Sequence, residues 1–242
     1  MDKKIKIALC LSGEPRSTMA SFPYIYESFL QHNPFYEVDV YAHSWKGFRA
    51  FELYNPINYS ITPVDTHSIF VNYLNNLNVS SQKIIENLLL YKPLTYNIHP
   101  LKNVFLMYSS VKECSSLINK EYNLYIRCRL DLFLESKINF NNLLPLFHSG
   151  IDMISSYKLN PTLKTLILDD QLAICNHKAF KVYSDLILDL ENLISQSQSF
   201  SPEILLETHL NNNNIKIYSY DFQHHLIKGS NIFSSYHNYK DE

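Results

Sequence analysis

The stretch Lys4-Ile-Lys-Ile-Ala-Leu-Cys-Leu-Ser12 is a nearly continuous apolar run, which is typical of a strand buried on both faces of a sheet. The turn signal Ser12-Gly13-Glu14-Pro15 ends this run. A helix that Ser21 could cap follows it, and Val38–His43 is a second apolar strand. Strand, helix and strand in this order predict the opening of an α/β layer with parallel strands.

Strands and helices alternate along most of the remaining chain. Apolar residues at helical spacing predict a helix over 102–118, directly before a strand over 122–131. No internal repeat or flexible linker interrupts this order, so we expect a single domain over 1–242 of the α/β class, with a mainly parallel central sheet flanked by helices. Further strands are expected at 151–156, 171–175 and 215–220, and helices after Asn176 and from Ser201 to Leu210.

Residues 47–100 do not follow this pattern. They are rich in Asn, Tyr and Pro, and their one helical candidate is Ser80–Leu90. We therefore expect a variable region of loops and helix here, which could surround a binding cleft or be a lineage-specific insertion.

Composition and charge limit the classes of partner. The chain has 242 residues, 46% of them hydrophobic, which is enough for a sizeable core. Its formal net charge of −2 argues against a nucleic-acid partner held by a general basic field. No signal peptide or membrane-spanning helix is visible in the sequence, so we expect a cytoplasmic protein that could associate peripherally with the inner face of a membrane.

Glycine and cysteine usage exclude several common sites. The chain has 4 glycines, and none of them forms a G-x-G-x-x-G dinucleotide loop or a G-x-x-x-x-G-K phosphate loop. The 4 cysteines lie far apart, each within an apolar run, so buried free thiols are expected rather than a zinc site or a disulfide framework. Such thiols fit a reducing compartment. They are Cys10, Cys114, Cys128 and Cys175.

The strand over 122–131 carries an unusual charged face. Its even positions are apolar, whereas its odd positions place Arg127, Arg129 and Asp131 side by side. Unpaired charges in a core would each cost several kcal/mol, so these groups must pair with each other, meet solvent in a cleft or meet an anionic ligand. Two cations and one anion leave a positive charge that suits a diphosphate, and Asp131 could hold a divalent ion against it.

The two N-terminal strands both end in residues suited to a ligand. After the first strand, Ser12 and Gly13 allow an anion to approach backbone N–H groups, and Arg16 offers a bidentate fork for phosphate. After the second, His43 and Trp45 could contact a base or a sugar ring. A solvated turn and a structural His–Trp pair are the plainer interpretations. The carboxyl ends of strands are where open α/β sheets bind ligands.

Two adjacent carboxylates precede the expected strand over 171–175. Asp170, or else Asp169, could act as general base on an acceptor hydroxyl, with Gln171 beside the sugar or acceptor. We place this cluster in a loop, where a solvated Asp pair is the plainer interpretation. His224 and His225 could complete a metal shell, although a surface pair of histidines is the simpler reading.

Taken in order, these clusters resemble a family of bacterial and viral GT-A-like glycosyltransferases, some of them associated with lipopolysaccharide or capsule synthesis. The resemblance spans roughly residues 5–220 and leaves 47–100 unmatched. The order of the motifs is a stronger signal than any single motif. The matching stretches are Ala8–Arg16, Val38–Trp45, Met107–Cys114, Tyr122–Asp131 and Asp169–Ile174.

The resemblance implies a GT-A-like (Rossmann-like) fold and a nucleotide-sugar donor bound across the strand ends, from which a sugar passes to a glycan hydroxyl. The first loop would lie near the nucleotide, Arg129 and Asp131 near the diphosphate, and Asp170 near the sugar or acceptor. Many GT-A enzymes carry an Asp-x-Asp pair for Mn²⁺ or Mg²⁺, whereas this chain has Arg129-Leu130-Asp131 at the corresponding triplet. A divalent cation is therefore an open expectation, and an arginine could supply part of its charge.

Two other functions fit the same residues. The chain could be a transferase that moves a phosphoryl-linked group to a glycan. It could also be a non-catalytic domain that binds a nucleotide or a carbohydrate. Turnover with a nucleotide sugar distinguishes both from the leading hypothesis.

Overall fold

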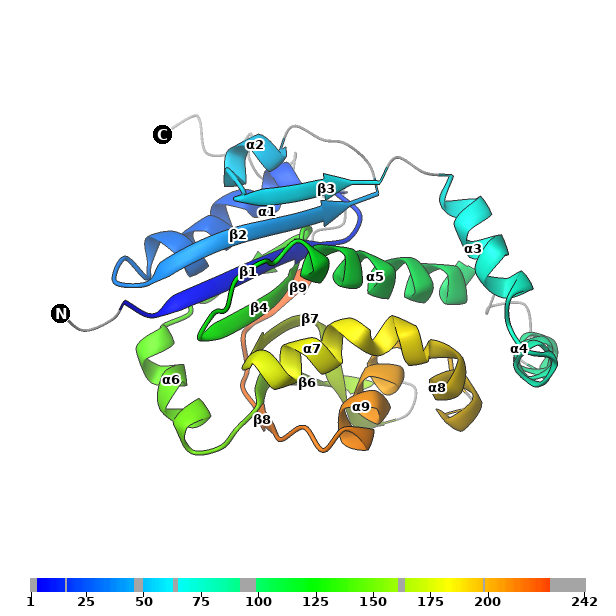
Figure 1. Ribbon diagram of the computed structural model, residues 1–242. Coiled ribbons are helices and arrows are strands. Elements are labelled where there is room, and N and C mark those ends of the chain that lie inside the picture. Colours follow the sequence, from blue (N-terminus) through cyan, green and yellow to red (C-terminus); the bar gives the residue numbers. More distant parts are fainter. Residues whose placement is uncertain are drawn as a thin grey trace, which may run out of the picture.

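The computed structural model describes residues 4–15, 17–45, 50–62, 65–91, 99–160, 164–197 and 199–226. A seven-stranded sheet in the order β3-β2-β1-β4-β7-β6-β8 forms its centre, and β5 pairs with β9 in a separate two-stranded sheet (Figure 1). The strands are β1 Lys6–Ser12, β2 Glu37–Ser44, β3 Asn58–Ile61, β4 Leu124–Arg129, β5 Leu132–Leu134, β6 Met153–Asn160, β7 Thr165–Cys175, β8 Ile217–Ser219 and β9 His224–Leu226.

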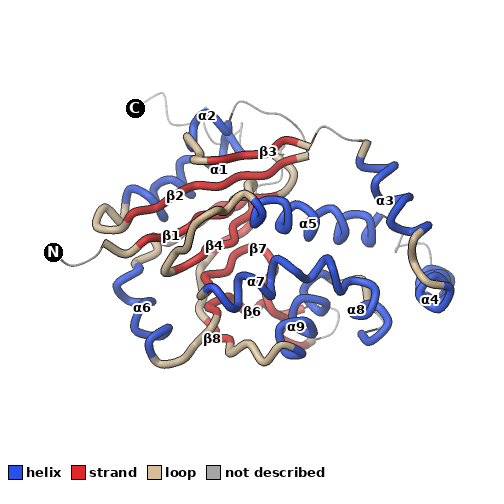
Figure 2. Tube along the Cα trace, in the orientation of Figure 1, coloured by secondary structure: helices blue, strands red, loops and turns tan. Residues whose placement is uncertain are grey.

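Helices cover both faces of the sheet (Figure 2). A π-helical turn, Tyr26–Gln31, extends α1, and a 3₁₀ turn, Leu186–Asp189, joins α7 to α8. The α-helices are α1 Thr18–Ile25, α2 Ala50–Tyr54, α3 Thr66–Asn75, α4 Val79–Tyr91, α5 His99–Ser116, α6 Phe140–His148, α7 His177–Asp185, α8 Leu190–Ser197 and α9 Pro202–Asn212.

The pairing pattern confirms a mainly parallel sheet. β1 runs parallel to β2 and to β4, β2 to β3, and β6 to β8, whereas β7 is antiparallel to both β4 and β6. The register places Ser12 opposite His43 on one side and opposite Arg129 on the other. The carboxyl ends of the three central strands therefore meet at one edge of the sheet, as expected for an α/β layer.

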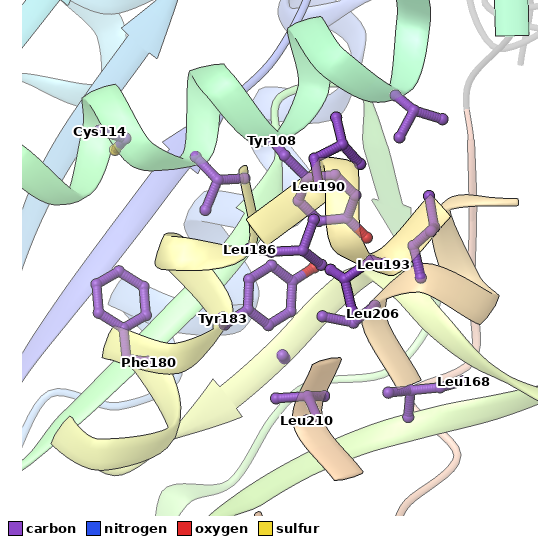
Figure 3. Packing of buried hydrophobic residues seen from close by; sticks show 14 of the residues in the cluster. Tyr108, Cys114, Leu168, Phe180, Tyr183, Leu186, Leu190, Leu193, Leu206 and Leu210 are labelled. Atoms are coloured by element: carbon purple, nitrogen blue, oxygen red, sulfur yellow. The ribbon is translucent and has the colours of Figure 1, made fainter. Parts of the chain in front are cut away.

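Two hydrophobic clusters lie on opposite faces of this sheet. One cluster packs α5, α7, α8 and α9 against the face that carries Cys10 and Tyr125, and Figure 3 shows its side chains around Tyr183. The other packs α1 and α6 against the face that carries Leu9 and Ile126. The alternation along β4 that the sequence predicted thus places Ile126 in one core and Tyr125 in the other, although the sequence did not indicate that the charged face also borders a core. All four cysteines are buried free thiols, which confirms that expectation.

Two local predictions were wrong, and the expectation for 47–100 was incomplete. The first helix begins at Thr18 and not after Ser21, whose hydroxyl instead donates to the carbonyl oxygens of Thr18 and Leu130. The described parts of 47–100 are mostly helical and include the edge strand β3, although the helix expected over 80–90 is confirmed as α4. Asp169 and Asp170 lie within the continuous strand β7 rather than in a loop, because pairing with β6 extends that strand back to Thr165.

Asn176 and Ser201 stand at the N-terminal ends of α7 and α9, and of these two only the Asn176 side chain makes a capping hydrogen bond. The Asn176 side chain accepts a hydrogen bond of 2.9 Å from the backbone N of Ala179, which caps α7 as predicted. Pro202 begins α9, where its missing N–H costs nothing.

Every helix in the described parts of the chain is too short or too polar to cross a membrane.

Candidate functional site

A cavity of about 550 Å³ opens where β1 and β4 end. The strand ends form one wall of this cavity, and α5, α9 and β7 contribute the others. Seven of the residues singled out in the sequence line it, which shows that distant motifs converge here. These residues are Ser12, Gly13, Trp45, Arg127, Arg129, Asp170 and Gln171. Arg16 falls outside the described residues.

Gly13 shapes the loop at the end of β1. Its φ of +124° lies in the region that favours glycine, and its backbone N donates to the carbonyl oxygen of His43 at 3.3 Å. A Cβ at this position would meet no atom within 4 Å, so the backbone conformation, and not crowding, requires glycine. The loop consequently leaves open space beside Ser12, whose buried Oγ has no hydrogen-bond partner among the described residues.

Arg127 is unusual because its charged side chain is fully buried. Its side chain is 0% exposed, yet Nε, Nη1 and Nη2 all lack a hydrogen-bond partner within the described parts of the chain. A buried guanidinium that makes no hydrogen bond is costly, because it has lost its hydration without compensation. It lines the cavity, where the Ser12 Oγ and the Gln171 Oε1 are also buried without partners. The wall therefore presents unsatisfied donors and acceptors to whatever enters the cavity.

The guanidinium group of Arg129, unlike that of Arg127, is paired with a carboxylate. Its Nε lies 2.9 Å from Oδ1 of Asp131 and its Nη2 lies 2.9 Å from Oδ2, so the two side chains form a bidentate pair. Asp131 is almost fully buried and does not line the cavity, whereas Arg129 does. Of the two arginines on β4, only Arg129 is neutralised by this carboxylate.

A bulge in β7 separates the two adjacent aspartates. Ser155 pairs with Ala173 and Tyr157 with Leu168, so residues 169–172 of β7 face the single residue Ser156 of β6. The Ser155 hydroxyl fixes this bulge by donating to the carbonyl oxygens of Asp169 (3.2 Å) and Leu172 (2.8 Å). Bulges commonly re-aim side chains next to active sites. Here Asp170 lines the cavity and Asp169 does not.

Asp170 is a buried carboxyl group with a raised pKa. It is 4% exposed, and burial, followed by the negative charges of Glu203 and Asp169, raises its pKa to about 7. The positive charges of Arg129 and Arg127 act in the opposite direction. A carboxylate with a pKa near the working pH can accept a proton and release it again.

Asp169 contacts basic side chains away from the cavity. Its carboxylate contacts His224 Nε2 and lies 3.4 Å from Lys158 Nζ, with both Asp169 and His224 buried. This cluster ties β9 to β6 and β7. His225, by contrast, is exposed and lies 3.1 Å from Glu135. The two histidines thus have separate partners, and neither Asp169 nor His224 lines the cavity.

His43 is part of the protein interior and does not line the cavity. Its Nδ1 is 2.6 Å from the Ser110 hydroxyl and its Nε2 is 3.1 Å from the Thr62 hydroxyl. Trp45 packs edge-on against its ring and donates from Nε1 to the carbonyl oxygen of Leu106 at 3.1 Å. Trp45 lines the cavity, and His43 contacts its ring without lining the cavity itself.

The pKa of His43 leads to a prediction of how protein stability depends on pH. Burial lowers the pKa of His43 to about 4, below the ordinary value of 6.5. Between these two values the unfolded chain takes up a proton that the native protein does not, so stability falls as the pH falls through this window, by about 3 kcal/mol in all. We expect His43→Gln to flatten the dependence of the unfolding free energy on pH between 7 and 4.5, measured by urea denaturation.

The matched control is His148→Gln, because His148 is exposed. This control should keep the slope of the wild-type protein. An unchanged slope in His43→Gln would contradict the buried neutral ring.

Glu14 and Thr66 also line the cavity, as do three residues for which the sequence carried no clear signal. Glu203 lies in the first turn of α9, and its Oε2 accepts a hydrogen bond of 2.6 Å from the Ser201 hydroxyl. Lys102 and Asn103 come from α5. The Ser201-Pro202-Glu203 helix start could have drawn attention to Glu203, but ordinary helices start in the same way.

Comparison with known proteins identifies the architecture. With the mannosyltransferase Ktr4p from S. cerevisiae in complex with GDP, the TM-score is 0.54 at 10% identity over 92% of this chain and 71% of that one. With core-mannan synthase A (CmsA/Ktr4) from Aspergillus fumigatus in its Mn/GDP form, it is 0.53 at 10% identity over 93% and 75%. The chain has a GT-A glycosyltransferase fold.

The GT-A fold confirms the architecture that the motif order implied. No family model matches the sequence, and no curated protein sequence matches it. At 10% identity the likeness concerns the fold. The function must therefore be argued from the cavity.

Proposed function

We propose that the protein is a glycosyltransferase that moves a sugar from a nucleoside-diphosphate sugar to a hydroxyl of a glycan acceptor. The observation that carries this proposal is that Arg127 lines a cavity and that its buried guanidinium has no hydrogen-bond partner in the described chain. A diphosphate offers several anionic oxygens at the spacing of a guanidinium fork. Binding would therefore satisfy donors that the free protein leaves unsatisfied.

The rest of the wall suits the same ligand. Ser12 and Gly13 end a strand of the sheet where α/β folds bind nucleotides, and the largely buried Trp45 contributes an aromatic residue to the cavity wall. Asp170 and Gln171 come from β7, on the far side of β4 from β1. We assign the nucleotide to the β1 side and the sugar and acceptor to the β7 side.

Asp170 would act as the base in an inverting transfer. The acceptor hydroxyl attacks the anomeric carbon, its proton passes to the Asp170 carboxylate, and the bond from that carbon to the diphosphate oxygen breaks with its electron pair on the diphosphate. The raised pKa of Asp170, at about 7, fits a group that must alternate between charged and neutral forms.

The proposal also includes the class of glycan that accepts the sugar. The motif order resembles glycosyltransferases of bacterial and viral surface glycans, so we propose lipopolysaccharide, capsule or a related glycoconjugate as the acceptor. A panel of UDP-, GDP-, CMP- and ADP-sugars, incubated with and without such glycans, tests both parts of the proposal. Turnover of one donor with sugar transferred to the glycan supports it. Saturable nucleotide binding without any turnover would favour a binding domain, and transfer of a phosphorylated group would favour a phosphotransferase.

Glu203 provides a test of the electrostatic part of this mechanism. Because the charge of Glu203 raises the pKa of Asp170, its removal in Glu203→Gln lowers that pKa. The basic form of Asp170 then persists to lower pH, so the acid limb of the kcat/KM profile should move to lower pH.

The control is Glu207→Gln, which removes the same charge from the same helix one turn later. Glu207 is half-buried and does not line the cavity, so this variant should keep the wild-type acid limb. Acid limbs that coincide in wild type and Glu203→Gln would refute the assignment of that limb to Asp170.

A further inference from the structure

The departing diphosphate needs positive charge beside it, which GT-A enzymes can obtain from a metal ion or from fixed cationic side chains. The similar structure of core-mannan synthase A is a Mn/GDP form. In this chain, Asp131 is the one carboxylate of the triplet Arg129-Leu130-Asp131. The question is whether its carboxylate can serve as a metal ligand.

The contacts of Asp131 do not suit a divalent cation. Both carboxylate oxygens already accept hydrogen bonds of 2.9 Å from Arg129, and the side chain is 4% exposed. A divalent cation would have to displace a bidentate guanidinium and then lie beside its positive charge, which is unfavourable in a buried site. Across the described ranges, no three side chains of the His, Cys, Asp or Glu types gather in a group that could hold a metal ion. The donor set therefore does not fit Mn²⁺ or Mg²⁺.

Fixed positive charge is already available at the same place. Arg127 and Arg129 lie two residues apart on one face of β4, and both line the cavity. The pair with Asp131 occupies Nε and Nη2 of Arg129 and leaves its Nη1 outside the pair. Arg127 has all three nitrogens without a partner among the described residues. A diphosphate in the cavity could thus meet donors from two guanidinium groups in a low-dielectric surrounding.

We infer that Arg127, aided by Arg129, binds the donor diphosphate and stabilises it as it leaves, in place of a divalent cation. This inference rests on the proposed function. When the bond between the sugar and the diphosphate oxygen breaks, the electron pair stays on the diphosphate. Both arginines line the cavity in the absence of ligand, so their positive charge is in place before that negative charge develops. Asp131 is then a positioning residue that holds Arg129 in place.

The test measures binding of UDP, GDP, CDP and ADP to the full chain by isothermal titration calorimetry. One arm contains EDTA, and the other contains Mn²⁺. We expect one nucleotide to bind saturably in EDTA, with no more than about a twofold gain in affinity on addition of Mn²⁺, a gain well below a tenfold change. Arg127→Gln should weaken that binding by about ten- to a hundredfold in both arms, because it removes charged hydrogen bonds. Arg127→Lys should recover part of the loss, since it keeps the charge without the fork.

The outcomes separate this inference from the function beneath it. Equal binding in the two arms supports the inference. Binding that appears only with Mn²⁺ overturns it while the glycosyltransferase proposal stands. Failure of every nucleotide to bind in either arm overturns both. The wild-type comparison needs no variant, so it remains decisive even where Arg127→Gln does not fold.

Discussion

Asp170→Asn is expected to lower the kcat of sugar transfer by about 10²- to 10⁴-fold, the contribution typical of a positioned general base. The asparagine keeps the shape of the side chain and loses the ability to take up the acceptor proton. Nucleoside diphosphate binding should persist, because we assign the diphosphate to Arg127 and Arg129. Initial rates with the active donor, together with calorimetric titration of the nucleotide, measure the two effects separately.

The same variant should also be more stable than the wild type at alkaline pH. Burial raises the pKa of Asp170 to about 7, whereas the unfolded carboxyl titrates near 3.8. Between these values the unfolded chain releases a proton that the native protein retains, so wild-type stability falls as pH rises through this window. Asp170→Asn removes this loss. Its advantage in thermal melting should be largest at pH 8 and should shrink toward pH 4.

Asp169→Asn is the matched control for both effects. Asp169 has the same side chain one position earlier, but its carboxylate contacts His224 and Lys158 instead of lining the cavity. Its removal leaves a buried histidine and a lysine without their carboxylate, so we expect a loss of stability and a smaller loss of kcat. Wild-type turnover in Asp170→Asn would refute the assigned base.

The sequence predicted which residues lie together at one cavity better than it predicted the hydrogen-bond partners of those residues. Alternation along 122–131 placed Arg127 and Arg129 on one face, and the order of strand ends brought Ser12 and Trp45 to the same cavity. Those inferences need only the period of a strand and the geometry of a parallel layer. They do not depend on any particular side-chain conformation.

Which side chains pair with each other depends on three-dimensional detail that the sequence pattern does not contain. Either arginine could have paired with Asp131, and the structure pairs Arg129. The different surroundings of Asp169 and Asp170 follow from a bulge opposite Ser155 and Tyr157, which strand periodicity does not predict. Glu203 joins the site because α9 packs against β7, a contact between distant segments.

Arg127→Met is expected to stabilise the ligand-free protein by about 1–4 kcal/mol while it abolishes nucleotide binding. Methionine fills much of the same space with an apolar, adaptable chain and removes a buried charge that makes no hydrogen bond in the described structure. Urea denaturation gives the free energy of unfolding of both proteins. Added nucleotide at about a hundred times its Kd should raise wild-type stability by roughly 2.7 kcal/mol and leave the variant unchanged.

Arg129→Met is expected to change stability in the opposite direction, although Arg129 lies on the same face of β4 as Arg127. This substitution leaves the buried Asp131 carboxylate without its bidentate partner, so we expect a loss of about 3–5 kcal/mol. A charge kept unpaired at the expense of stability is a recurrent property of binding sites, whereas a paired charge contributes to the fold. The two variants therefore distinguish an arginine without an internal partner from one that is paired within the protein. If Arg127→Met loses stability as Arg129→Met does, Arg127 is paired within the protein and does not await a diphosphate.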